Sequence, residues 1–79
     1  MPTPEVNVDY AQLEEQLGQL KEKGNNQFRK KAYKEAVKHF SIAIKAFEDA
    51  GRPINKGDIK TKVTQIYTNR ATSLHLLNQ

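Results

Sequence analysis

The sequence contains neither cysteine nor tryptophan, and it has no long apolar run. Without cysteine, neither a disulfide nor a thiolate metal site can form, which is compatible with a reducing compartment. The longest mostly apolar segment, residues 41–47, is interrupted by Lys45. A membrane helix needs about 20 apolar residues, so we expect a chain that does not span a bilayer.

Targeting signals are also missing from the first residues. The stretch from Met1 to Glu5 has neither the basic start nor the apolar segment of a secretory signal, and Pro2 excludes an N-myristoylated glycine. We therefore expect a cytoplasmic protein, with the nucleus as the alternative compartment.

Residue patterns for catalysis are missing as well. His39 and His75 are the only histidines, and no second ligand lies at metal spacing from either. No serine stands in a recognisable nucleophile motif, and the glycines do not form a phosphate-binding loop. We expect no enzymatic activity, no metal and no cofactor.

The composition that is present is that of a small globular domain. The 79 residues are 37% hydrophobic and 28% charged, with a net charge of +4. A chain of this length buries only about 60% of the surface of its unfolded state, so the core is expected to be thin. The positive charge favours acidic partners.

Apolar residues recur at helical spacing in three segments. Pro2 and Pro4 predict a flexible lead-in over residues 1–8. Asp9 is expected to cap a first helix over about 9–30, with Gln12 at capping-box spacing. The apolar face of this helix comprises Tyr10, Leu13, Leu17, Leu20, Gly24 and Phe28.

Two further helices are expected over about 34–50 and 58–78. Gly51 and Pro53 form a strong helix stop, and Gly57 with Asp58 supplies a turn and a new N-cap. No strand-like alternation occurs, so the fold class is all-α with one helical segment over 9–79. Glycine inside a helix costs about 1 kcal/mol relative to alanine. Gly24 therefore suggests a close antiparallel contact with Ala36 and Ala43 of the second helix.

These positions resemble the tetratricopeptide-repeat (TPR) family. The order of Leu20, Gly24, Phe28, Ala36 and Phe40 follows the family pattern, although Lys23 replaces its leucine and the expected proline is missing. The resemblance covers residues 17–79, about one and a half repeats of about 34 residues each. It implies a TPR-like antiparallel hairpin plus a third helix, with an elongated connection between the second and third.

Two short strings, residues 20–25 and 67–71, resemble the carboxylate-clamp co-chaperones of this family more specifically. The resemblance implies that Lys21, Asn25 and Asn69 grip the C-terminal carboxylate and aspartate of a Glu-Glu-Val-Asp tail of a heat-shock chaperone. In the family, a lysine and an arginine on a fifth helix complete the clamp. The sequence ends at Gln79, so about half of the clamp is expected here.

The residue types agree with this interpretation. Lys21 and Asn25 are four residues apart and share one side of a helix, where an ammonium and an amide together suit a carboxylate. Two alternatives stay open. One is that Lys21 is a solvated surface charge, and the other is that Asn25 and Asn69 make hydrogen bonds within the fold.

Two other functions also stay open. In the first, the chain is a structural TPR segment. Its Leu74, Leu76 and Leu77 then lack neighbours, and a homodimer forms unless the third helix closes onto the first two. Alternatively, a basic surface binds nucleic acid or an anionic membrane, although the basic cluster has no interleaved aromatic residues. That cluster comprises Arg29, Lys30, Lys31, Lys34 and Lys38.

Overall fold

The computed structural model describes residues 9–79, so the expected lead-in over residues 1–8 lies outside the described part. Three helices are present: α1 spans Tyr10–Arg29, α2 spans Tyr33–Asp49 and α3 spans Ile59–Leu77. No strand occurs within residues 9–79, and the all-α fold is confirmed. Each helix begins and ends one residue away from the position expected from the sequence.

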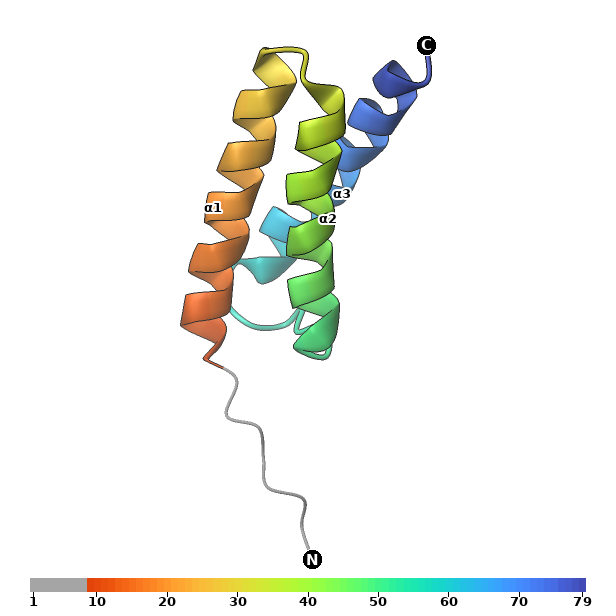
Figure 1. Ribbon diagram of the computed structural model, residues 1–79. Coiled ribbons are helices and arrows are strands. Elements are labelled where there is room, and N and C mark those ends of the chain that lie inside the picture. Colours follow the sequence, from red (N-terminus) through yellow and green to blue (C-terminus); the bar gives the residue numbers. More distant parts are fainter. Residues whose placement is uncertain (1–8) are drawn as a thin grey trace, which may run out of the picture.

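The helices run up, down and up (Figure 1). α1 and α2 form an antiparallel hairpin, and α3 packs against both of them. α3 runs in the same general direction as α1 and crosses behind α2. α1 and α3 are therefore neighbouring helices that run roughly parallel to each other.

The start of α1 is capped as the sequence predicts. The backbone N–H of Gln12 donates to the Asp9 carboxylate at 3.1 Å, which satisfies one of the free amides of the first helical turn.

The ends of α1 and α2 share one hydrogen-bond pattern. Lys31 N–H donates to the Phe28 carbonyl at 2.9 Å, and Ala32 N–H donates to the Gln27 carbonyl at 2.9 Å. The equivalent bonds at the end of α2 come from Gly51 and Arg52, at 3.0 and 3.1 Å. Both are Schellman motifs, which place one residue in the left-handed region. That residue is Lys31 (φ 61°) in the first motif and Gly51 (φ 85°) in the second.

Asp58 is the N-cap residue of α3, as expected, but its side chain does not cap the helix. The Asp58 carboxylate accepts no backbone N–H from the first turn of α3 and accepts instead from Lys62 Nζ at 3.5 Å. The Asp58 N–H donates to Glu14 of α1 at 2.6 Å. The connection is also tied to α1 by Lys56, whose ammonium lies 5.4 Å from the centre of the Tyr10 ring.

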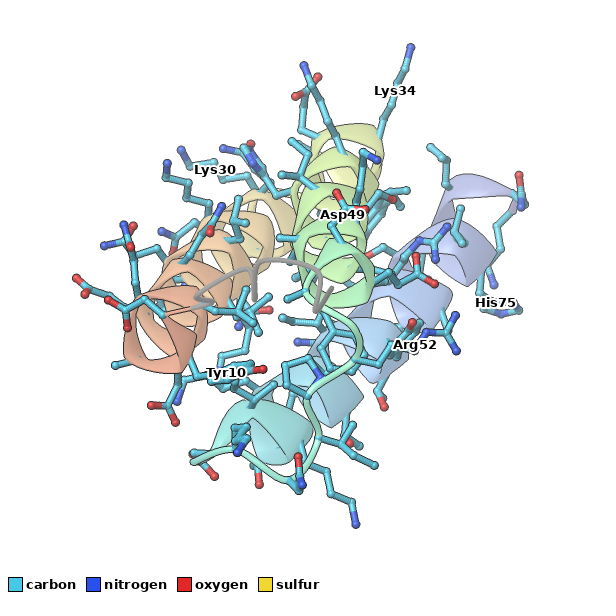
Figure 2. The ribbon with its side chains drawn as sticks, turned by 90° about the horizontal axis from the view of Figure 1, so that it is seen from below. Tyr10, Lys30, Lys34, Asp49, Arg52 and His75 are labelled. Atoms are coloured by element: carbon cyan, nitrogen blue, oxygen red, sulfur yellow. The ribbon has the colours of Figure 1, made fainter. Side chains whose placement is uncertain are left out.

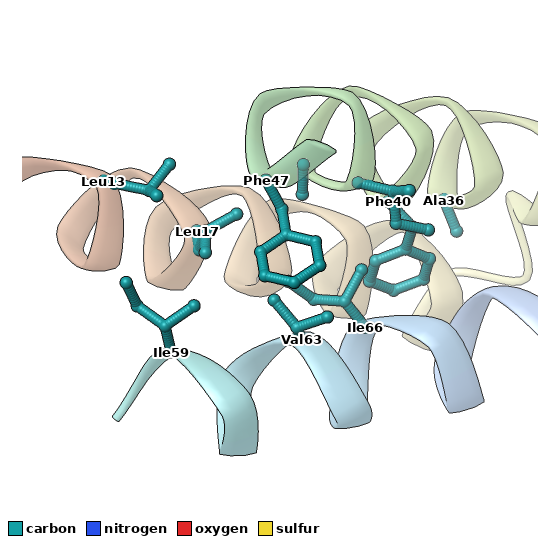
Figure 3. Close-up of a cluster of buried hydrophobic side chains, with 10 residues drawn as sticks. Leu13, Leu17, Ala36, Phe40, Phe47, Ile59, Val63 and Ile66 are labelled. Atoms are coloured by element: carbon teal, nitrogen blue, oxygen red, sulfur yellow. The ribbon is translucent and has the colours of Figure 1, made fainter. Parts of the chain in front are cut away.

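A single apolar core lies between the three helices (Figure 3). α3 contributes Ile59, Val63 and Ile66 to it, so the third helix closes onto the hairpin of its own chain. The other core residues are Leu13, Leu17, Ala36, Phe40, Ala43, Ile44 and Phe47.

The predicted contact at Gly24 is correct in kind but wrong in partner. The nearest atoms to a Cβ built on Gly24 all belong to the Phe40 ring, with Cζ at 2.6 Å. The small residue thus makes room for an aromatic ring, and the two alanines are not its closest neighbours.

The end of α3 is less exposed than expected. Leu74 and Leu76 are half-buried, whereas Leu77 is 44% exposed. Within residues 9–79, no helix combines the length and the apolar content needed to cross a bilayer.

Candidate functional site

Polar side chains connect α1 to α3 along one edge of the fold. Three hydrogen bonds join Glu14 to Asp58, Lys21 to Gln65, and Asn25 to Asn69, and each spans 44 residues of sequence. This constant separation follows from the shared direction of the two helices. The three α1 residues lie at helical spacing on one face.

The two predicted asparagines meet. Asn69 Nδ2 donates to Asn25 Oδ1 at 2.9 Å, and both residues are half-buried. Behind them, the hydroxyl of the buried Ser73 donates to the Asn69 carbonyl at 2.8 Å. Each asparagine keeps at least one N–H that this bond does not use, because an amide group carries two donors.

The predicted lysine lies one turn before the asparagine pair. Lys21 Nζ donates to Gln65 Oε1 at 2.7 Å. An ammonium group has three donors, so two of them are not used by this bond. Gln65 was not identified from the sequence, although it precedes Asn69 by the same four residues that separate Lys21 from Asn25.

The structure therefore brings Lys21, Asn25 and Asn69 together on one edge. It also shows that the two asparagines hydrogen-bond to each other within the fold, which is the alternative expected from the sequence. Lys21 is half-buried and hydrogen-bonded, so it is not a freely solvated charge. The donors that remain on all three side chains are suited to an anionic oxygen.

A cavity of about 160 Å³ opens beside the asparagine pair. Its lining residues are Asn25, Phe28, Arg29, Asn69 and Thr72. The Phe28 ring makes an edge-to-face contact with Tyr33, with centroids 5.4 Å apart, which fixes this wall of the cavity. Arg29 was assigned from the sequence to the basic cluster and not to the site.

The rest of that basic cluster does not converge. Lys30 and Lys34 extend outward from the turn between α1 and α2 (Figure 2), and Lys31 and Lys38 are exposed. Arg29 is the member of the cluster that lines the cavity.

The remaining candidates form no second site. His39 is half-buried, and His75 is exposed and points away from the helices (Figure 2). No group of three or more metal-ligating side chains occurs in the described part of the chain. Arg70 is half-buried.

Comparison of the chain with protein-family models, with curated proteins and with solved structures gives no match.

Proposed function

We propose that this protein is an interaction module that binds the acidic C-terminus of a partner protein along the edge between α1 and α3. The observation that carries the proposal is the convergence of Lys21, Asn25 and Asn69, with hydrogen-bond donors to spare. The resemblance to carboxylate-clamp co-chaperones supports the C-terminal tail of a heat-shock chaperone as the ligand.

Binding adds hydrogen bonds to donors that the bonds within the fold leave free. A ligand carboxylate accepts from the Lys21 ammonium and from the amide of Asn25. The carboxylate takes up donors of the Lys21 ammonium that the bond to Gln65 leaves free, and the new hydrogen bond joins two ionised groups. Asn69 holds Asn25 in place, because it donates to Asn25 Oδ1 and leaves the donors of Asn25 Nδ2 unused by this bond.

Nuclear magnetic resonance titration tests this proposal. Adding a short peptide that ends in Glu-Glu-Val-Asp is expected to shift the side-chain amide resonances of Asn25 and Asn69. Lys21→Ala should weaken binding by about 1.5–3 kcal/mol, the contribution of a hydrogen bond to a charged group. Amidation of the peptide's C-terminus should weaken it similarly.

Lys23→Ala is the matched control. Lys23 is exposed and lies two residues from Lys21, a separation that directs the two side chains to different sides of α1. Its loss removes the same charge but leaves the edge intact, so binding should change little. Equal losses in the two variants would show attraction by net charge alone, and unchanged binding of the amidated peptide would show that the terminal carboxylate is not recognised.

A further inference from the structure

Arg29 lines the cavity next to the asparagine pair, and neither the sequence resemblance nor the proposed function gives it a role. Building on the proposed function, we propose that Arg29 is a second cationic residue of the binding edge. It binds an acidic side chain of the ligand, upstream of the terminal carboxylate.

The spacing along α1 supports this role. Arg29 lies four residues after Asn25 and eight after Lys21. With a rise of 1.5 Å per residue, these separations are about 6 and 12 Å along the helix axis. An extended peptide advances by about 3.3–3.6 Å per residue. A carboxylate held between Lys21 and Asn25 therefore places Arg29 beside a ligand residue about two to four positions upstream.

The cavity between these groups has the size of one side chain. Its volume of about 160 Å³ is similar to that of an engineered cavity of about 150 Å³ that holds benzene. It is well below the roughly 300–1,000 Å³ of sites for drug-sized ligands. A peptide that extends one side chain into the cavity therefore fits better than a nucleotide or another compact small molecule.

The guanidinium of Arg29 is held only weakly by its own chain. Its nearest carboxylate, on Glu22, is 4.0 Å away, and both side chains are more than 60% exposed. Such exposed pairs contribute little. Its other partner is the neutral side-chain oxygen of Asn26 in the same helix. A ligand carboxylate offers the guanidinium a bidentate acceptor instead.

The test is a double-mutant cycle that combines a substitution of Arg29 with a substitution of one residue in the peptide. Two peptides share a free C-terminal carboxylate, and they carry either Glu or Gln at the third residue upstream. Arg29→Gln is expected to weaken the Glu peptide about three- to fivefold, as for a partly exposed ion pair, and to leave the Gln peptide unchanged.

Lys30→Gln is the matched control, because Lys30 is the adjacent exposed cation and does not line the cavity. It should affect both peptides equally. Circular dichroism checks that both variants keep their helical content.

The outcomes separate this proposal from the one on which it rests. If Arg29→Gln weakens both peptides equally, Arg29 acts through net charge and this proposal is overturned. The proposed function then stands, provided that Lys21→Ala and amidation still weaken binding. If neither peptide shifts the Asn25 and Asn69 amide resonances, both proposals are overturned.

Discussion

Gly24 is the position at which the α1–α2 hairpin tolerates the least added volume. A Cβ there would lie 2.6 Å from Cζ of Phe40, and Phe40 is itself fully buried. The ring cannot move away without displacing the rest of the core. Gly24→Ala should therefore lower the free energy of unfolding by about 1–3 kcal/mol, the usual cost of overpacking, in urea denaturation.

Gly18 provides the control within the same helix. A Cβ at Gly18 meets the Lys62 side chain at 3.3 Å, near the end of a flexible chain. Gly18→Ala should thus be neutral or stabilising, with up to about 1 kcal/mol gained from helix propensity. If both substitutions had the same effect, the close packing of Phe40 on Gly24 would be wrong.

The sequence identified part of the candidate site and missed part of it, for physical reasons. Lys21, Asn25 and Asn69 belong to short strings that resemble a known clamp, so the sequence singled them out. It did not single out Gln65 and Arg29, because their places beside these residues depend on how α3 is positioned against α1. Helical periodicity identifies the faces of each helix but not the register between two helices.

The C-terminal ends of α1 and α2 differ in whether glycine holds the left-handed position. Both α1 and α2 end in a Schellman motif, but the left-handed position is Lys31 in one and Gly51 in the other. A residue with a side chain lowers the stability by about 1–2 kcal/mol in this conformation. Glycine avoids this steric cost, but part of the gain is offset because glycine loses more backbone entropy on folding. Lys31→Gly should raise the free energy of unfolding by about 0.5–1 kcal/mol, measured by thermal denaturation.

Gly51→Ala is the reverse experiment. No atom lies within 4 Å of a Cβ at Gly51, so the backbone conformation alone sets the cost. The melting temperature should fall for Gly51→Ala and rise for Lys31→Gly. A fall in both would mean that the Lys31 side chain stabilises the turn.

The helices themselves followed from local patterns, whereas the hydrogen bonds of Asp58 at the start of α3 did not. Capping at Asp9 involves residues within one turn, and the sequence predicted it correctly. Asp58 has the same residue type before a helix, yet its backbone is bound by Glu14, which is far away in the sequence. A tertiary contact of this kind competes with a local cap, and local patterns do not reveal it.

An apolar face remains on the molecule where α2, the connection and α3 meet. A cavity of about 410 Å³ there is lined by Phe47, Arg52, Ile54, Lys60, Val63, Thr64 and Tyr67. Ile54 and Tyr67 are 54% and 41% exposed, and Arg52 lies beside α3 (Figure 2). The sequence led us to expect a homodimer through the leucines at the end of α3 unless α3 closed onto the hairpin. Because α3 does close, this face is a different candidate for self-association.

Self-association through this face should be weak and should strengthen with salt. Each chain carries a net charge of +4, and salt screens the repulsion between two copies. In sedimentation equilibrium, the average mass should rise with protein concentration, and more so at high salt. Binding of an acidic peptide should respond to salt in the opposite direction.

Tyr67→Ser should reduce the association, whereas Ile42→Ser should not. Ile42 has a similar exposure of 45% but does not line this cavity. A monomer mass at every concentration and salt level would contradict the prediction. It would mean that the closed three-helix chain does not self-associate.

The constant separation of 44 residues between α1 and α3 partners also bears on the order of folding. The α1–α2 hairpin closes over a short turn, but each α1–α3 bond requires a much longer loop to close, at a greater entropic cost. Forming the hairpin first shortens that loop, because α2 then returns the chain alongside α1. We therefore expect Asn25 and Asn69 to meet only late in folding, so that a partially folded chain has its hairpin but lacks the edge between α1 and α3.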